Sequence, residues 1–206
     1  MKIAVIDYKA GNLRNVQKAV ESLGVESDII SEPQDLASYS GIILPGVGNF
    51  SNGIEYLNHS GLDKIIVSEA QDFKKPLLGI CLGMQLLAES SEEGGIKKGL
   101  GLLPMTVKYF DIQNKQERVP HMGWNSISPD KESILLKDIP VDSDFYFAHS
   151  YHAVLNDKSI IAATCKYAYS FPAAVEHKNI FASQFHPEKS QRYGSIVLKN
   201  FLSYCA

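Results

Sequence analysis

The sequence predicts a single α/β domain, residues 1–206, built on an open and mostly parallel sheet with helices on both faces. Two observations predict this fold class. In the first half of the chain, short apolar runs alternate with amphipathic stretches, and the runs lack the polar alternation of half-exposed strands. In the second half, several candidate strands follow one another through short connections, which predicts additional antiparallel strands there. A chain of 206 residues is long enough to bury one sizeable core.

The first half is expected to supply the parallel strands and most of the helices. After the first apolar run, apolar residues recur at helical spacing up to Gly24, which is a suitable helix C-cap. These apolar residues are Leu13, Val16, Val20 and Leu23. The expected strands cover residues 2–7, 27–30, 41–44 and 76–80, and the expected helices cover residues 13–23, 61–72 and 81–89.

The second half reads differently, because strand patterns dominate and helical patterns are few. One apolar run leads into His186, and an amphipathic segment closes the chain. The expected strands cover residues 106–110, 143–147, 160–167, 173–176 and 181–185, and the last helix covers residues 193–204. No internal repeat or linker divides the chain.

The composition excludes several classes of protein. With a net charge of −3, a pI near 6.1 and scattered basic residues, the chain has no nucleic-acid or membrane-surface footprint. No apolar stretch approaches the ~20 residues that span a bilayer, and the start reads as a first strand instead of a signal peptide. Three cysteines without a CxxC pair argue against a disulfide framework and a zinc site, so we expect no metal and a reducing cytoplasm.

The most informative position is Cys81, where a strand runs into Gly-x-Cys-x-Gly and a helix follows. This is the pattern of a nucleophile elbow with cysteine in place of serine. Gly79 and Gly83 let the strand and helix backbones approach, and the helix N-terminus favours an ionised thiol. The N–H of Leu82 would face a developing oxyanion, and Gln85 would lie beside the sulfur. A buried structural cysteine in a glycine-rich turn is the competing interpretation.

A cysteine nucleophile needs a histidine base that a third group orients, and His186 is the strongest candidate. Pro187 biases His186 toward an extended backbone, in which residues i and i+2 point the same way, so Glu188 can approach its imidazole. Active sites of open α/β sheets also gather after strand ends. A surface His-Pro-Glu turn is the competing interpretation. The other histidines have no carboxylate so well placed; they are His59, His121, His149, His152 and His177.

The two motifs together resemble the class I (triad-type) glutamine amidotransferases, whose members share a flavodoxin-like α/β fold and hydrolyse glutamine to glutamate and ammonia. Further segments resemble most the glutaminase subunits of imidazole glycerol phosphate synthases. These segments are Asp7-Tyr8-Lys9-Ala10-Gly11-Asn12-Leu13, Pro45-Gly46-Val47-Gly48, Pro120-His121-Met122-Gly123-Trp124-Asn125, His149-Ser150-Tyr151 and His186-Pro187-Glu188-Lys189-Ser190-Gln191. The resemblance extends from residue 1 to residue 202, and the Pro-His-Met-Gly-Trp-Asn run is its most specific part.

The resemblance implies a role for each matching position. The catalytic residues would be Cys81, His186 and Glu188. The residues around the oxyanion and the amino-acid end of glutamine would be Gly46, Val47, Gly48, Leu82, Gln85, His149, Ser150 and Tyr151. The residues towards a partner would be Asn12, Trp124 and Lys189. A core aromatic is the competing interpretation of Trp124, and His121 is expected to be structural. Lys9 departs from the glycine common in the subfamily, which puts the docking contact of Asn12 in question but not the chemistry.

The same resemblance implies a heterodimer with a (β/α)8-barrel cyclase subunit of histidine biosynthesis. Ammonia would pass through the barrel to an opened-ring ribonucleotide intermediate, giving imidazole glycerol phosphate and aminoimidazole carboxamide ribotide. The chemistry also calls for a partner, because free ammonia is protonated in neutral water and a chain filled by the glutaminase fold has no acceptor domain. No metal or redox cofactor is needed for attack by the Cys81 thiolate and hydrolysis of the thioester. Glycines on both sides of Val47 predict a movable turn that keeps the glutaminase idle until the partner is loaded.

Two other functions stay open at this point. A paralogous glutaminase could supply ammonia to a sugar-amidating synthase while keeping the same motifs. A non-catalytic regulatory module could use the same fold, although the complete set of Cys81, His186, Glu188 and Gln85 argues against it.

Overall fold

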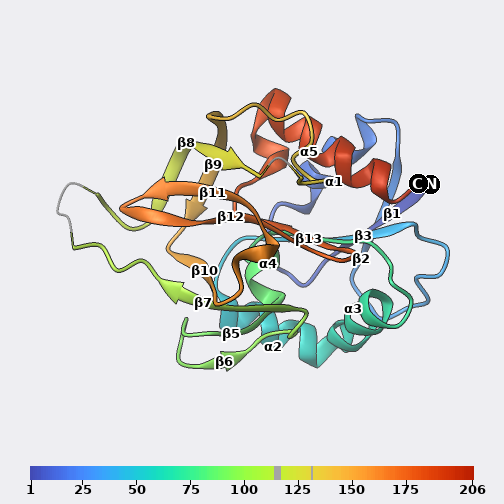
Figure 1. Cartoon of the computed structure of the whole chain (residues 1–206). Helices are drawn as coiled ribbons and strands as arrows, with labels where there is room; N and C mark the ends of the chain where they lie inside the picture. Colours follow the sequence, from blue (N-terminus) through green and yellow to red (C-terminus); the bar gives the residue numbers. More distant parts are fainter. Residues whose placement is uncertain (114–116, 131) are drawn as a thin grey trace.

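A nine-stranded sheet forms the centre of the structure, a computed structural model that describes residues 1–113, 117–130 and 132–206 (Figure 1). Its strands lie in the order β2-β1-β3-β4-β13-β12-β11-β8-β9. The first five are parallel, and their order is that of flavodoxin-like sheets. The strands from β12 onward pair antiparallel, so the predicted fold class is confirmed. The bounds are β1 Lys2–Ile6, β2 Glu26–Ile30, β3 Gly41–Gly46, β4 Leu77–Cys81, β8 His121–Pro129, β9 Ser143–His149, β11 Ile161–Tyr167, β12 Tyr169–His177 and β13 Ile180–Ser183.

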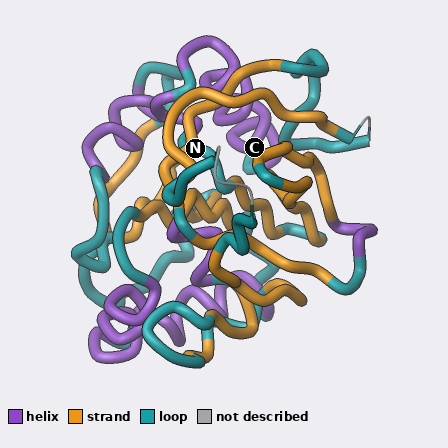
Figure 2. Tube along the Cα trace, turned by 90° about the vertical axis from the view of Figure 1, so that its left-hand side faces the viewer, coloured by secondary structure: helices purple, strands orange, loops and turns teal. Residues whose placement is uncertain are grey.

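Helices cover both faces of this sheet. Helices α1 and α5 lie on one face, and α2, α3 and α4 lie on the other, so that in Figures 1 and 2 helices stand above and below the strands. The helices are α1 Leu13–Glu21, α2 Phe50–Ser60, α3 Leu62–Gln71, α4 Leu82–Leu86 and α5 Gln191–Tyr204. The amphipathic pattern of α1 buries Val16 and Val20, and the helix is followed by Gly24 with a left-handed φ of 80°, as its sequence predicts. No helix among the described residues is long and apolar enough to cross a membrane.

A second sheet of four short strands packs on the face that carries α2 and α4. Its order is β10-β7-β5-β6, with β5 Ala88–Ser91, β6 Lys97–Lys98, β7 Leu103–Tyr109 and β10 Tyr151–Leu155. Buried side chains of β7 and β10 join the core under that face. The late strands of the chain are therefore divided between an extension of the main sheet and this separate layer.

The helix expected over residues 81–89 is shorter than predicted, and this expectation is corrected. Helix α4 ends at Leu86, and β5 begins two residues later. The backbone carbonyls of Leu86 and Leu87 accept hydrogen bonds from the N–H groups of Leu100, Leu102 and Leu103. This tertiary pairing takes carbonyls that a longer helix would need for its own bonds, which is why the apolar pattern alone misleads here.

Several elements have no counterpart among the expected ones: the short strands β5 and β6, helix α2, and strands β8 and β10. Helix α2 buries Phe50, Ile54 and Leu57 on one face and is capped by Asn49, whose side chain accepts the N–H of Asn52. Strand β8 buries only His121 and Ile127 of its nine residues and has few apolar side chains, so its sequence carries little strand signal. Strand β10 is five residues long and follows β9 after a single residue.

The carboxyl ends of the parallel strands lie at one edge of the main sheet. There β1 leads into the turn before Asn12, β3 ends at Gly46, β4 ends at Cys81, and β13 leads into His186. Ligands of open α/β sheets bind at this edge. The topology therefore brings together four segments that are far apart in the sequence.

Candidate active site

Cys81 occupies a strained turn between β4 and α4. Its φ of 53° and ψ of −107° lie in a region that L-residues rarely adopt, and its side chain is 4% exposed. The flanking glycines leave room for this geometry. A Cβ on Gly79 would lie 2.9 Å from the carbonyl oxygen of Gly83, and a Cβ on Gly83 would lie 1.7 Å from that of Leu44 in β3. The predicted strand–turn–helix geometry at Cys81 is thus present.

His186 and Glu188 make the contact that the sequence predicts. Nδ1 of His186 lies 2.9 Å from Oε1 of Glu188, and both side chains are buried. The backbone N–H of His186 donates to the carbonyl of Tyr146 in β9 at 2.9 Å, and its carbonyl accepts the hydroxyl of Ser190 at 2.6 Å. The imidazole is therefore fixed by its own ring contact and by backbone contacts on both sides.

The protonation of His186 is set by the groups around its ring. Burial lowers the pKa of His186, but attraction to Cys81 and the hydrogen bond and attraction to Glu188 outweigh it and raise the pKa from 6.5 to about 10. Nδ1 is taken by Glu188, and Nε2 is buried with no hydrogen-bond partner in the described part of the chain. A charged imidazolium in this place carries a proton that it can give to a leaving group.

The Pro-Gly-Val-Gly turn lies beside Cys81. Gly46 is the register partner of Cys81 in the parallel pair β3·β4. The hydroxyl of Tyr8 occupies the place that a Cβ of Gly46 would need, at 1.7 Å from it, so this position requires glycine. Gly48 has a φ of 120°, and Val47 is exposed. Leu82, as the first residue of α4, has an N–H without an intrahelical acceptor.

Gln85 and the loop after β9 also meet at the site. Nε2 of Gln85 donates to the carbonyl of Tyr151 at 2.9 Å and to Oε1 of Gln184 at 3.1 Å. Nε2 of Gln184 lies 3.7 Å from Sγ of Cys81. The ring of His149 contacts the same Tyr151 carbonyl through Nδ1 at 2.7 Å, and Ser150 lies between the two residues. Gln85, His149 and the Tyr151 carbonyl thus form one network, which reaches Cys81 through Gln184.

Two residues of the site were not anticipated. Gln184, which is fully buried, joins Gln85 to Cys81. The alternation argument that pairs Glu188 with His186 also applies to Gln184, two residues on the other side, so the signal was available. Tyr8 is fully buried under Gly46, and burial and the charge of Cys81 raise its pKa. Its role depends on the tertiary contact between the ends of β1 and β3, which no local pattern reveals.

Two of the expected partner-facing residues, Trp124 and Lys189, lie around Tyr146, next to His186. Trp124 is 50% exposed and packs edge-on against Tyr146 at 6.1 Å, while Nζ of Lys189 lies 5.4 Å from the centre of the Tyr146 ring. The competing interpretation of Trp124 as a core residue is wrong, because half of its surface is exposed. The ring of Tyr146 in turn lies 6.3 Å from that of His186.

Asn12 lies at the N-terminal end of α1 and is exposed, and the turn before it keeps the geometry that glycine would give. Lys9 adopts a φ of 61°, and its N–H donates to Oδ1 of Asp7 at 2.8 Å. An aspartate that bonds the backbone two residues on supports such a turn without glycine. A Cβ on Gly11, in the same turn, would lie 3.1 Å from Cα of Gly46, so the two backbones are in close contact.

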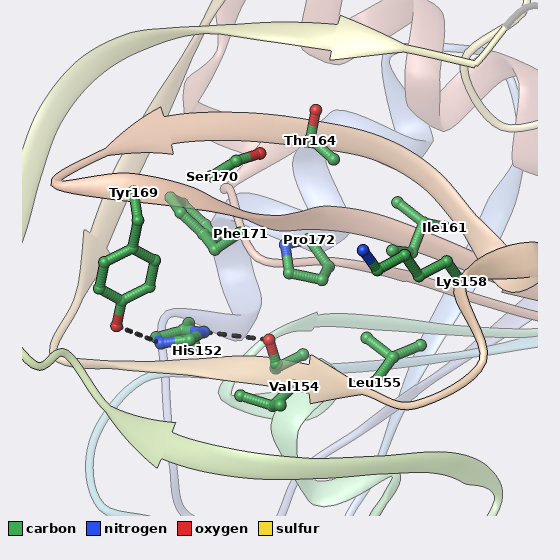
Figure 3. A pocket seen from close by; sticks show the side chains of 11 residues that line it. His152, Val154, Leu155, Lys158, Ile161, Thr164, Tyr169, Ser170, Phe171 and Pro172 are labelled. Carbon is green, nitrogen blue, oxygen red and sulfur yellow. Dashed lines mark hydrogen bonds between the residues drawn. The ribbon is translucent and has the colours of Figure 1, made fainter.

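A cavity of about 350 Å³ lies elsewhere, between β10 and the β11–β12 pair. Figure 3 shows His152 and Tyr169 at one end of it and Lys158 at the other. None of the expected site residues lines this cavity, so it is separate from the network around Cys81.

Comparisons with known proteins agree with this geometry. The family model "Glutamine amidotransferase class-I" matches residues 4–204. "Imidazole glycerol phosphate synthase subunit HisH" of Moorella thermoacetica is 45% identical over 199 residues, which cover 97% of this chain and 93% of the relative. The protein of the same name from Chlorobium luteolum is 45% identical over 200 residues, covering 97% and 98%. Among solved structures, PurLQS from Thermotoga maritima superposes with a TM-score of 0.77 at 20% identity, covering 100% of this chain and 99% of that one, which shows a shared fold.

Proposed function

Because the chain belongs to the class-I glutamine amidotransferases and, within them, to the HisH subunits of imidazole glycerol phosphate synthase, we propose that Cys81, His186 and Glu188 carry its glutaminase reaction. The chain is the glutaminase subunit of that synthase and works with a partner subunit. The observation that carries the residue assignment is the elbow backbone of Cys81 beside a histidine whose other nitrogen is 2.9 Å from Glu188. The relatives favour histidine biosynthesis over a sugar-amidating paralogue, and the complete triad argues against a non-catalytic module.

The first chemical step forms a covalent intermediate. The thiolate of Cys81 attacks the side-chain carbonyl carbon of glutamine, and the carbonyl oxygen becomes an oxyanion between the Leu82 N–H and the Gly46–Gly48 turn. The imidazolium of His186 gives its Nε2 proton to the amide nitrogen as the carbon–nitrogen bond breaks. Ammonia leaves, and a γ-glutamyl thioester and a neutral histidine remain.

The second step reverses the proton flow. Neutral His186 takes a proton from a water molecule as the water oxygen attacks the thioester carbonyl. The carbon–sulfur bond breaks, glutamate leaves, and the thiolate and imidazolium are restored. Glu188 keeps the ring oriented and stabilises its positive charge without itself transferring the proton. No metal or redox cofactor takes part in this scheme.

The partner subunit is proposed to be a (β/α)8-barrel cyclase that docks over the edge carrying Trp124, Lys189 and Asn12. Ammonia loses its nucleophilicity once protonated, so an enclosed path into the partner is required. The glycines around Val47 support a gate, because a turn with Gly46 and Gly48 can change its peptide orientation at low cost. We propose one amidotransferase domain over residues 1–206 and a cytoplasmic location, which the free cysteines Cys81, Cys165 and Cys205 support.

Replacement of Cys81 by alanine tests the assignment. In the reconstituted complex, Cys81→Ala should abolish glutamine-dependent synthesis, because the thioester cannot form, while ammonium salts should still support the partner's reaction. Glutamate release and imidazole glycerol phosphate formation are the two measurements. Glutaminase activity that survives in the variant would show that the nucleophile is wrong, and equal glutaminase rates with and without partner would exclude the gate.

A further inference from the structure

A run of hydrogen-bonded groups connects strand β8 to the amide of Gln85. Nδ2 of Asn125 lies 3.1 Å from Nε2 of His121, and Nδ1 of His121 lies 3.0 Å from Nε2 of His149. Nδ1 of His149 lies 2.7 Å from the carbonyl oxygen of Tyr151. Gln85 donates to that same oxygen at 2.9 Å. We call Asn125, His121, His149 and the Tyr151 carbonyl the histidine relay.

The direction of every hydrogen bond in the relay is fixed at its two ends. At the inner end the Tyr151 carbonyl can only accept, so Nδ1 of His149 must carry its proton and Nε2 must be bare. At the outer end, Nδ2 of Asn125 also donates to the carbonyl of Lys166 at 3.1 Å, and its Oδ1 accepts the N–H of Ser126 at 2.9 Å. Asn125 therefore presents its NH₂ group to His121.

A single tautomer of each histidine satisfies the hydrogen bonds at both ends of the relay. Nε2 of His121 accepts from Asn125, and its Nδ1–H donates to the bare Nε2 of His149. Both rings must stay neutral for this arrangement, and burial lowers the pKa of His121 to about 4 and that of His149 to about 3. His121 is also stacked between the rings of Phe147 and Tyr167, at 4.7 and 4.1 Å. Neither ring is free to turn.

The relay determines which atom of the Gln85 amide is available to bind a substrate. The Tyr151 carbonyl accepts from His149 and from Gln85, which uses both of its lone pairs. Both protons of the Gln85 amide are used as well, because Nε2 also donates to Gln184. In the part of the chain that the structure describes, no donor reaches Oε1 of Gln85, so this oxygen is left to accept from the α-ammonium group of an amino acid.

We propose that His149 and His121 are positioning residues for glutamine binding, which hold the Tyr151 carbonyl and thereby the Gln85 amide with Oε1 facing the substrate. This inference rests on the proposed function, since it assigns a task in glutamine recognition. His149, part of the segment expected to hold glutamine, acts through Tyr151 because both of its ring nitrogens have protein partners. His121, expected to be structural, is the second member of the relay.

The tautomers give a direct spectroscopic test on the unmodified protein. In ¹⁵N spectra of the histidine-labelled complex at neutral pH, His121 and His149 should both show a protonated Nδ1 and a bare Nε2. Histidine side chains outside such a network do not have to adopt this tautomer. Burial alone would therefore not produce the same tautomer in both rings. A protonated Nε2 on His149 would overturn the relay, whatever the activity of the enzyme.

Kinetics of the complex with its cyclase partner test the positioning role. His149→Leu should raise KM for glutamine about tenfold, the effect of losing one hydrogen bond at the site, and leave kcat within about threefold. His149→Asn retains a donor where Nδ1 stood, so KM should recover to within about threefold of the wild type. His121→Leu should raise KM about threefold, because it acts one bond further out.

His152 supplies the matched control. It is a buried histidine that packs on Phe110, as His149 does, but its Nε2 bonds the hydroxyl of Tyr169 at 2.7 Å and its Nδ1 lies 3.0 Å from the Ala153 carbonyl (Figure 3). His152→Leu should leave KM within about twofold while losing comparable thermal stability.

Two outcomes of the kinetics contradict the proposal. An equal rise in KM for His152→Leu and His149→Leu would show a general loss of packing, and a failure of Asn to rescue His149 would show that the donor is irrelevant. A wild-type complex without glutaminase activity would instead refute the proposed function, and the tautomer measurement would still decide whether the relay exists.

Discussion

At Cys81 the backbone is held at a φ of 53° and a ψ of −107°, a conformation that costs on the order of 1–3 kcal/mol and persists because its neighbours leave no alternative. Glycine on either side permits it, and pairing of β4 with β3 and β13 secures the strand before it. The thiol then stands beside His186, whose pKa rises to about 10 despite burial. The proposed reactivity of Cys81 therefore depends on its pairing with His186, and titration of the histidine can test this pairing.

We expect the titration of His186 to depend on both of its partners. Because its pKa lies near 10, the ring stays protonated through neutral pH and loses its proton only as the pH rises toward that value. Cys81→Ala should lower the pKa most, since it removes the strongest attraction, and Glu188→Gln should lower it less. NMR titration of His186 in the three proteins measures this. A pKa that is the same in Cys81→Ala and in the wild type would contradict the charge pair.

The loss of activity should likewise be larger when the proton donor is replaced than when the residue that orients it is replaced. His186→Ala removes the proton donor and should lower kcat at least about 100-fold, whereas Glu188→Gln should cost less because it only loosens the ring.

At the scale of elements, the site depends on how closely α4 approaches the neighbouring strand β3. A Cβ on Gly83 would fall 1.7 Å from the carbonyl of Leu44, which is a backbone atom and cannot move without disturbing the sheet. A Cβ on Gly53 in α2 would instead meet side-chain atoms at 3.2 to 3.4 Å, which can adjust. Gly83 is therefore required by the geometry of the site, whereas Gly53 is an ordinary helical glycine.

Gly83→Ala should destabilise the protein by about 3 kcal/mol or more, at the upper end of the cost of overpacking. Gly53→Ala should stay within about 1 kcal/mol of the wild type, because the better helix propensity of alanine offsets the closer contact. Urea denaturation of both variants measures the free energy of unfolding. Equal losses at the two positions would show that the approach of α4 to β3 is not constrained in this way.

In the whole molecule, the exposed ring of Trp124 lies near the edge of the sheet at which β4 ends in Cys81 and β13 leads into His186. Trp124 is half exposed beside Tyr146, whose ring neighbours His186. Phe73 is 70% exposed but lies between α3 and the start of β4, at the opposite edge of the sheet from Cys81. A partner that receives ammonia has to cover the first edge and not the second.

Trp124→Ala should weaken binding of the cyclase subunit by about 2 kcal/mol, or roughly 30-fold in Kd, as loss of a central aromatic contact does. Phe73→Ala removes a comparable exposed ring and should leave Kd unchanged. Isothermal titration of each variant with the partner measures both. Loss of affinity in Phe73→Ala alone would place the interface at the other edge.

Local periodicity predicts the fold class and all five parallel strands, and a spacing of two residues predicts the contact of His186 with Glu188. The elbow at Cys81 was likewise visible, since only small flanking residues allow that turn. Tertiary structure decided what local spacing does not encode. It ended α4 at Leu86 by pairing its carbonyls with residues 100–103, placed Tyr8 under Gly46, and aligned His121 with His149 across β8 and β9. Each of these features depends on contacts between segments that are distant in the chain. The energies of such contacts cannot be predicted from a short stretch of sequence.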